Sequence, residues 1–302
     1  MKLLAPGVWR LKQFPAPSVN VYLAEDVLID AGTLWDRRRI FAEIDGRDLA
    51  LLALTHVHPD HQGVAKDVCE ARGIPLACHP DDVDAMEGRR PIQEAHPNHP
   101  VNRVIKRFWQ GPPHPVGRVL QEGDEVAGFR VVHAPGHARG EVIFFRDSDR
   151  VAICGDVIRN MSYATGRPMI AEPPEIFTYD PAENRRSIHK LAALEPSLIL
   201  PGHGPALTDI AAFKRFVSRL PPDRAGRPDY ACALMAEAIE HGFKEGDKVW
   251  VEDGEGRHHP GIFVGDNESS GWFGGGPSAY VVHPEAHQAE VVSIFRITPR
   301  DE

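Results

Sequence analysis

The 302-residue chain has few cysteines, no long apolar run and no excess of positive charge, and each shortage excludes a class of protein. Its four cysteines form no C-x-x-C pair, and Cys69 and Cys154 lie in apolar patterns, which favours buried thiols in a reducing cytoplasm. Because no stretch of about 18 apolar residues occurs, we expect no membrane-spanning helix and no membrane partner. The net charge of −9 disfavours nucleic-acid binding, which requires a basic face.

Histidine, by contrast, is clustered. The chain holds 16 histidines, and three of them fall with one aspartate in the string Thr55-His56-Val57-His58-Pro59-Asp60-His61. The string follows the apolar run 49–54, which predicts a buried strand with the string at its end. Imidazole and carboxylate groups are the usual ligands of zinc and similar divalent ions. The spacing therefore predicts a metal site.

Local backbone preferences indicate how these side chains are divided between metals. Pro59 disfavours helix at His58, so His56 and His58 are expected in a turn and facing one metal. Asp60 is expected to start a helix that continues to about residue 71, and to turn together with His61 toward a second metal.

Three later segments each combine a short apolar strand, a glycine turn and a side chain of the metal-binding type. The first ends in Gly136-His137, the second in Gly155-Asp156 and the third in Gly202-His203. Together with the histidine string and Asp30 in Leu28-Ile29-Asp30-Ala31-Gly32, they form an ordered set that resembles the metallo-β-lactamase superfamily over about residues 1–210. Within that superfamily the chain looks most like the broad glyoxalase-type branch.

The resemblance implies a site for two divalent metal ions, with zinc expected and iron or manganese as alternatives. The first ion would be held by His56, His58 and His137, the second by Asp60, His61 and His203, and Asp156 would bridge both. Asp30 would orient a ligand histidine through a hydrogen bond.

Two other residues near these motifs do not fit the ligand pattern. His133 matches no ligand position and is expected to be structural. Glu141 stands where Ser, Thr or His is frequent in the superfamily, and we expect it to change only the edge of the site.

Strand and helix patterns alternate along the first 220 residues, which predicts an α/β or α+β protein. The resemblance implies a four-layer αββα sandwich, with two mixed sheets packed face to face and helices outside. Strands are expected near residues 7–13, 19–24, 26–30, 49–54, 74–78, 117–120, 124–132, 141–146, 150–155 and 197–201. Helices are expected near residues 35–44, 61–72, 80–86, 183–194, 208–219 and 229–241.

The last part of the chain differs in charge from the rest. From Arg227 onward there are six basic and fourteen acidic residues, so this segment carries −8 of the total charge of −9. The shift indicates a boundary within residues 222–228, between a catalytic domain of residues 1–226 and an accessory domain of residues 227–302. Four short strands after a linking helix predict a small antiparallel β-barrel-like domain, and dimerisation is one role that it could have.

Two segments are expected to border the substrate. Residues 87–116 are rich in proline and histidine and carry a local excess of three positive charges, which predicts an active-site flap or a solvated loop. The segment after Asp156 carries Arg159, Asn160 and Tyr163, which would either contact the substrate or hold that segment in place.

The expected chemistry follows from two adjacent cations, which can generate a bridging hydroxide near neutral pH and polarise the bond that it attacks. Asp60 would bind one ion and also transfer the proton. The resemblance therefore implies a hydrolase that cleaves an ester-like bond in a small molecule, namely a thioester, a lactone or a β-lactam. An anionic substrate would suit the positive charges of residues 87–116.

Three alternative functions compete with this hydrolase, and the sequence disfavours two of them. A mono-iron persulfide dioxygenase would need only His56, His137 and Asp156, so the number of bound metals distinguishes it from the hydrolase. A nuclease is disfavoured by the net charge of −9. A non-catalytic binding protein is disfavoured by the intact set of ligand-type residues.

Overall fold

The computed structural model describes residues 1–12, 19–92, 100–163, 165–220, 243–252, 257–266, 278–283, 289–293 and 296–300. Contacts within the chain divide it into two compact units, Met1–Asp223 and Arg224–Glu302. The expected helix 229–241 lies outside the described residues. Among the residues described, no helix is long and apolar enough to cross a membrane.

The first sheet of the larger unit changes from antiparallel to parallel pairing along its length. Strands β1 to β4 pair in antiparallel fashion, and β4 to β7 pair in parallel. The seven strands are β1 (Lys2–Ala5), β2 (Val8–Arg10), β3 (Tyr22–Ala24), β4 (Val27–Ile29), β5 (Leu51–Ala53), β6 (Leu76–Cys78) and β7 (Arg118–Val119). Because β4, β5 and β6 run in one direction, the segments after them leave the sheet at the same edge.

The second sheet has the order β14-β11-β10-β9-β8. Only β11 and β14 are parallel neighbours, but β9 also runs in their direction because β10 is antiparallel to both β9 and β11. The strands are β8 (Glu125–Val126), β9 (Phe129–His133), β10 (Val142–Arg146), β11 (Val151–Gly155) and β14 (Leu198–Pro201). A separate pair, β12 (Arg159–Asn160) and β13 (Ile170–Ala171), follows β11.

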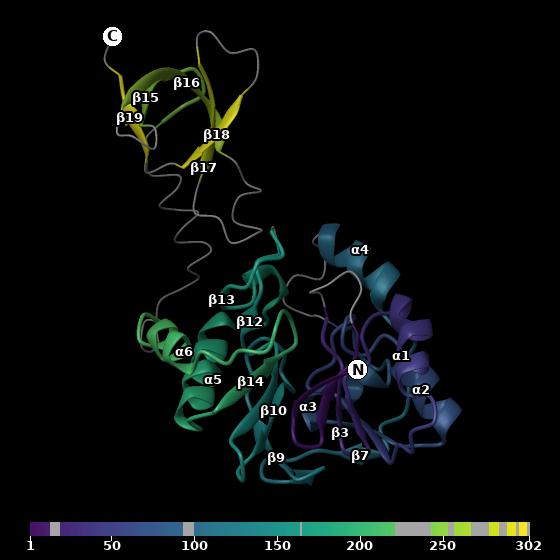
Figure 1. Ribbon diagram of the computed structural model, residues 1–302. Coiled ribbons are helices and arrows are strands. Elements are labelled where there is room, and N and C mark those ends of the chain that lie inside the picture. The colour runs from purple at the N-terminus through teal and green to yellow at the C-terminus, as the bar shows by residue number, and fades with distance from the viewer. Residues whose placement is uncertain are drawn as a thin grey trace. The chain divides into compact units, whose positions relative to one another are not determined.

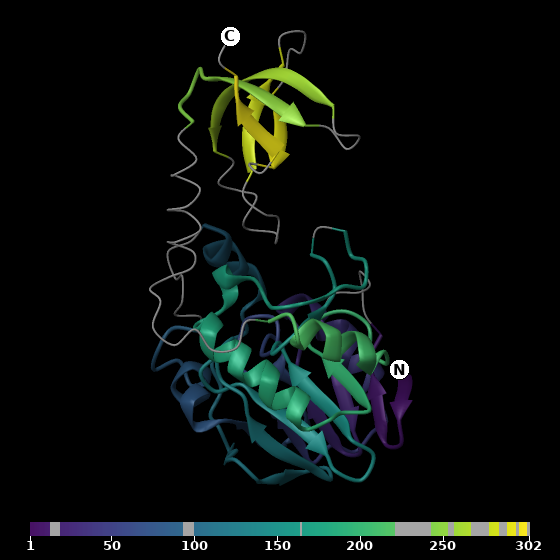
Figure 2. The same ribbon diagram turned by 90° about the vertical axis from the view of Figure 1, so that its left-hand side faces the viewer.

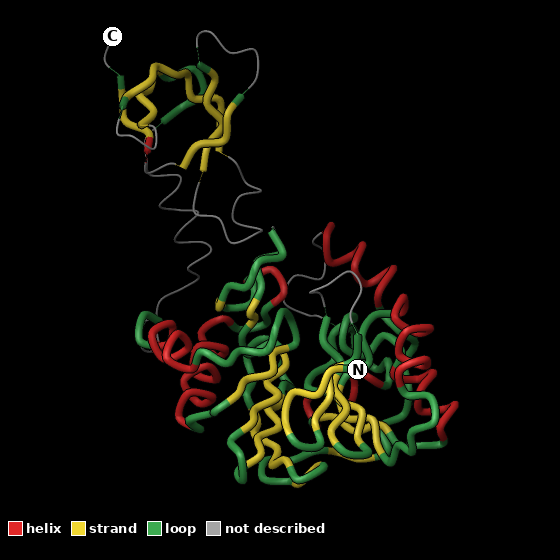
Figure 3. The backbone as a smooth tube through the Cα atoms, in the orientation of Figure 1, coloured by secondary structure: helices red, strands yellow, loops and turns green. Residues whose placement is uncertain are grey.

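Helices cover the outer faces of both sheets, as Figures 1 and 3 show. On the first sheet these are η1 (Leu34–Asp36), α1 (Arg37–Glu43), α2 (Ala65–Arg72) and α3 (Pro80–Met86). On the second sheet, α5 (Pro181–Ala193) runs across the strands beside α6 (Ile210–Val217), as Figure 2 shows. The remaining helices are α4 (Pro100–Trp109) and the short η2 (Glu175–Phe177).

Alternating side chains of each strand divide the interior into three apolar layers. In β4, Leu28 packs with Ile40 of α1, whereas Val27 and Ile29 pack with Phe144 of the second sheet. The face of the second sheet that points away from the first sheet packs against α5 and α6. The expected four-layer αββα sandwich is confirmed.

The sequence-based start of helix α2 is wrong. We expected a helix from about Asp60, but α2 begins at Ala65. The reason is that residues 61–64 bond to the loop after β4: Ala31 donates its N–H to the His61 carbonyl, and Val64 donates to the Ala31 carbonyl. These tertiary hydrogen bonds replace the helical ones.

The segment 87–116 is more than a loop. Helix α4 occupies its middle, and the side-chain amide of Asn102 donates to the Ile176 carbonyl at 3.1 Å. After the helix, the side-chain amide of Gln62 donates to the Gly111 carbonyl at 3.2 Å. Residues 93–99 lie outside the described part of the chain. The described part of this segment is therefore tied to both halves of the larger unit.

The smaller unit contains a separate five-stranded antiparallel sheet in the order β18-β17-β16-β15-β19. Each of the four expected strands has a counterpart, and a fifth short strand was not predicted. The strands are β15 (Lys248–Glu252), β16 (His258–Asp266), β17 (Ser278–Val282), β18 (Glu290–Ser293) and β19 (Ile297–Pro299). Val249, Phe263 and Val281 are in its apolar core.

We expect Phe144→Ala to lower the free energy of unfolding by about 3–5 kcal/mol, because the ring is fully buried between the two sheets and its removal leaves a cavity. Urea unfolding followed by circular dichroism measures the effect. Leu3→Ala is the control, since Leu3 is 58% exposed and its loss should change stability by less than about 0.5 kcal/mol. Equal stability of the Phe144 variant and the wild type would contradict the packing described here.

Candidate metal centre

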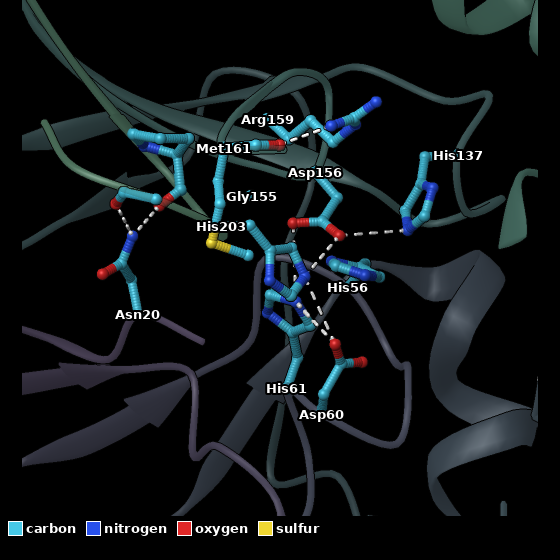
Figure 4. Close-up of polar contacts among 12 residues, drawn as sticks. Asn20, His56, Asp60, His61, His137, Gly155, Asp156, Arg159, Met161 and His203 are labelled. Atoms are coloured by element: carbon cyan, nitrogen blue, oxygen red, sulfur yellow. Dashed lines mark hydrogen bonds and ion pairs between the residues drawn. The ribbon is translucent and has the colours of Figure 1, made fainter. Parts of the chain in front are cut away.

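The strand ends of both sheets bring the candidate metal ligands to one edge of the sandwich. Asp30 follows β4 and the histidine string follows β5 in the first sheet. His137, Asp156 and His203 follow β9, β11 and β14 in the second sheet. Figure 4 shows His56, Asp60 and His61 after the first sheet and His137, Asp156 and His203 after the second converging on a common centre.

One group of three imidazoles can hold a metal ion. The ligand-type atoms of His56, His58 and His137 all lie within 4.8 Å of one another. The three rings are buried, and their centroids are 4.6 to 5.0 Å apart. This group combines the turn after β5 with the loop after β9.

A second group lies beside the first. Ligand-type atoms of Asp60, His61 and His203 also fall within 4.8 Å of one another. Asp156 stands between the groups: its Oδ2 is 3.0 Å from His203 Nε2 and 3.5 Å from His137 Nε2, and its Oδ1 is 3.5 Å from His61 Nε2. One carboxylate therefore faces both groups.

The polar atoms at the centre fit a pair of cations. The Nε2 atoms of His56, His61 and His137 and the Oδ1 atom of Asp156 are buried, and within the described part of the chain none has a hydrogen-bond partner. Buried polar atoms without partners destabilise a fold unless something else satisfies them. Imidazole nitrogens and carboxylate oxygens are good ligands for divalent metals, so bound ions would satisfy all four atoms.

Comparison with known proteins agrees with this geometry. The family model of the metallo-β-lactamase superfamily matches residues 15–203. The chain belongs to the metallo-β-lactamase superfamily. It is similar to the probable metallo-hydrolase YflN of Bacillus subtilis (strain 168), with 29% identity over 201 residues that cover 60% of this chain and 76% of YflN. The protein is thus a metal-dependent hydrolase of this superfamily.

Two further relatives bear on the site. The crystal structure of TTHA1623 in a di-iron-bound form has 29% sequence identity and a TM-score of 0.51, and the match covers 66% of this chain and 94% of that one. The acyl-coenzyme A thioesterase MBLAC2 of Gallus gallus is 33% identical over 164 residues, which cover 46% of this chain and 57% of MBLAC2. Members of the superfamily bind divalent metals, and the candidate groups of this chain fit that property.

In this metallo-β-lactamase fold, the protein holds three of the ligand rings, those of His56, His61 and His137, by the Nδ1 atom. His61 Nδ1 lies 2.9 Å from Asp30 Oδ2, and His137 Nδ1 lies 3.3 Å from the Thr178 hydroxyl. His56 Nδ1 lies 3.1 Å from the Thr55 hydroxyl, which is in turn 2.9 Å from Asp30. These contacts leave the Nε2 atoms of these three rings facing the centre, which is the arrangement that metal-binding histidines need.

Burial and neighbouring charges set the protonation of the site. Desolvation is the main cause that lowers the pKa of His58 to about 3 and of His137 to about 4, so both rings are neutral ligands at neutral pH. Burial by itself would raise the pKa of Asp60, but the charges of His61 and His203 lower it to about 2. Burial would likewise lower the pKa of His61, yet Asp30 and Asp156 raise it to about 9.

Close backbone packing adds a constraint that the sequence motifs do not show. A Cβ atom on Gly202 would lie 2.1 Å from Asp156 Oδ1 and 2.8 Å from His61 Cε1, so only glycine fits there. The fully buried Asn20 holds the same loop, because its side-chain amide donates to the carbonyls of Pro201 at 2.7 Å and Gly204 at 2.8 Å, as Figure 4 shows.

The structure corrects the position expected for Glu141. It is fully buried rather than at the edge of the site, and its Oε1 accepts the Asp156 backbone N–H at 2.6 Å. Burial raises the pKa of this carboxyl, and the charge of Asp156 raises it further. The four apolar residues at the start of β10 (Val142–Arg146), directly after Glu141, were the available signal, because a charge at the start of a buried strand needs a specific partner.

Of the expected substrate contacts, two are engaged in holding their own segment. Arg159 donates from Nε to the Glu172 carbonyl at 2.9 Å, and Asn160 donates from its side-chain amide to the Pro205 carbonyl at 3.0 Å. Tyr163 is placed differently: its half-buried ring stands perpendicular to the ring of His203, with centroids 5.3 Å apart. Burial and the charges of Asp156 and Asp60 raise the pKa of this phenol well above its usual value.

A further histidine pair, outside the two ligand groups, makes structural contacts. The rings of His79 and His133 stack in parallel with centroids 3.8 Å apart. His79 Nδ1 accepts the Asp81 backbone N–H, and His133 Nε2 lies 3.0 Å from the Arg139 carbonyl. His79 Nδ1 and His133 Nε2 therefore already have partners. An imidazole binds a metal ion in the plane of its ring, so two parallel stacked rings cannot both bind one ion.

We expect Gly202→Ala to weaken metal binding at least about 10-fold, because the added methyl group displaces the Asp156 carboxylate. The affinity is measured for the metal-free protein by Zn²⁺ titration against a chromophoric chelator. Gly46→Asn is the control, since a Cβ at Gly46 meets nothing within 4 Å and Asn tolerates its φ of +67°. An unchanged affinity of the Gly202 variant would contradict the packing of this loop against Asp156.

Proposed function

We propose that this protein is a binuclear metal-dependent hydrolase that cleaves the thioester bond of a small acyl thioester. The observation that carries the proposal is the cluster of buried ligand-type atoms at the strand ends, in particular the imidazole nitrogens without other partners. The likeness to the acyl-coenzyme A thioesterase MBLAC2 favours a thioester over a lactone or a β-lactam.

In this proposal His56, His58 and His137 hold one ion, and Asp60, His61 and His203 hold the other, with Asp156 shared between them. Zinc is our first assignment because it favours imidazole and carboxylate ligands. Iron is the alternative, supported by the di-iron form of TTHA1623. When bound, two such ions would lower the pKa of a coordinated water molecule and polarise the carbonyl group of a thioester.

The residues of the chain supply orientation and proton transfer. The carboxylate of Asp60 is more accessible than that of Asp156, with the Asp60 side chain 16% exposed. Its Oδ2 lies 3.3 Å from His203 Nε2. It is therefore suited to take the proton of the attacking water and to deliver it to the leaving thiolate. Tyr163 lies against the ring of His203, and in this proposal its hydroxyl donates to the substrate.

We expect the purified protein to contain about two equivalents of metal per chain, because the ligand set forms two groups around Asp156. Inductively coupled plasma mass spectrometry of protein purified without added metal gives the number and the identity. One equivalent of iron alone would contradict the binuclear proposal and favour the persulfide dioxygenase alternative.

We expect Asp60→Asn to lower kcat for acyl-coenzyme A thioesters by at least about 100-fold, because the amide cannot accept the proton. Release of free thiol, followed with a thiol-reactive dye, measures the rate, and the metal content of the variant is determined alongside. Asp147→Asn is the matched control, since this carboxylate is 66% exposed and pairs only with Arg130 among the described residues. Full activity of the Asp60 variant would contradict this role. Hydrolysis of lactones or β-lactams but not thioesters would contradict the substrate class.

A further inference from the structure

Glu141 is a buried acid that the proposed reaction does not use. Its carboxylate lies beneath the ligand cluster, where Oε1 accepts the backbone N–H of Asp156 at 2.6 Å and lies 3.6 Å from His56 Nδ1. The Oε2 atom is buried, and no partner for it occurs among the residues that the structure describes. A buried carboxylate destabilises a fold unless nearby positive charge compensates it.

Three ligand-bearing segments meet around this side chain. Val142, the next residue, donates its backbone N–H to the Thr55 carbonyl at 2.8 Å, and Ala134 donates to the Glu141 carbonyl at 2.8 Å. Gly155, with a φ of +50°, leaves space for the carboxylate, because a Cβ there would lie 2.7 Å from Glu141 Oε1. The segments that carry His56 and His137 thus bond to the backbone of Val142 and Glu141, and the segment that carries Asp156 bonds to the Glu141 side chain.

The surroundings of His56 select one of its tautomers, and the nearby charge of Glu141 supports the same tautomer. The Thr55 hydroxyl has one proton, which it donates to Asp30 at 2.9 Å, so it accepts from His56 Nδ1 at 3.1 Å. The Glu141 carboxylate near the same nitrogen favours a proton there. The lone pair of His56 is then on Nε2, which points into the cluster.

We infer that Glu141 is a positioning residue of the metal cluster, which fixes Asp156 through its backbone N–H and holds His56 in the tautomer that can bind a metal. This inference rests on the metal cluster of the proposed function. The positive charge that the buried carboxylate needs would come from the bound ions, so the carboxylate and the ions stabilise each other.

Two substitutions separate the charge of Glu141 from its hydrogen bond. Glu141→Gln keeps an oxygen that can accept the Asp156 N–H but removes the charge, and Glu141→Met removes both. Glu43→Gln is the control, since Glu43 is a partly buried carboxylate that pairs with the N-terminal amine at 2.5 Å. Each is tested in the full chain, by Zn²⁺ titration of the metal-free protein against a chromophoric chelator and by thermal unfolding without metal.

We expect the affinity for Zn²⁺ to fall about 10-fold in Glu141→Gln and about 100-fold in Glu141→Met, while Glu43→Gln binds as the wild type does. The metal-free Glu141→Gln protein should unfold at the same temperature as the wild type or higher, because glutamine keeps an acceptor for the Asp156 N–H and has no acidic group to bury. A purely structural role would instead lower the unfolding temperature of the metal-free protein.

Several outcomes would overturn the inference. These are wild-type affinity in both Glu141 variants, a lower unfolding temperature of metal-free Glu141→Gln, or failure of Glu141→Gln to fold. If only Glu141→Met fails to fold, the Zn²⁺ affinity and the metal-free unfolding temperature of the isosteric Glu141→Gln variant test the inference. A wild-type protein that binds no Zn²⁺ would overturn the proposed function itself, whereas unaffected variants of a metal-binding wild type would overturn only the role of Glu141.

Discussion

Burial of imidazole and carboxylate groups at one shared edge is the constraint on which the rest of the structure depends. Such groups lose hydration when they leave water, so a fold keeps them there only if each polar atom has a partner. Here other protein groups lie within hydrogen-bond distance of the Nδ1 atoms of His56, His61 and His137. The Nε2 atoms face the Asp156 carboxylate and one another. The sandwich provides this edge because β4, β5 and β6 run parallel, as do β9, β11 and β14.

Rigid parts of the fold hold the ligands, and less regular parts border them. Asp156 and His203 follow buried parallel strands directly, and Gly202 lets these two loops pack in contact. The surroundings are built differently: one side-chain hydrogen bond joins α4 to η2, and another joins the segment after α4, at Gly111, to Gln62. This division suits a superfamily in which the metal chemistry is shared and the substrate is chosen by the surrounding segments.

Most regular elements of the larger unit were predictable because their signals are local. Apolar runs such as 151–155 and the helix at 80–86 follow directly from the order of residues. The elements of the larger unit that were missed are β1, β12, β13, α4 and η2, and two of them show the physical reasons. Strand β12 has only two residues and so no periodicity, and helix α4 begins at Pro100 in a proline-rich segment that resembles a loop. The start of α2 was wrong because tertiary hydrogen bonds to Ala31 outweigh local helical preference.

The amino-acid order alone determined the ligand types, their sequence along the chain and the family, because the motif at His56 to His61 and the later strand ends carry that information locally. Only the tertiary structure decided which atoms meet. Asn20 holds the His203 loop from 181 residues away, as its bond to Pro201 shows. Glu141 lies beneath Asp156 rather than at the rim, and Arg159 bonds to its own segment. Such contacts depend on how two sheets pack, which no local pattern encodes.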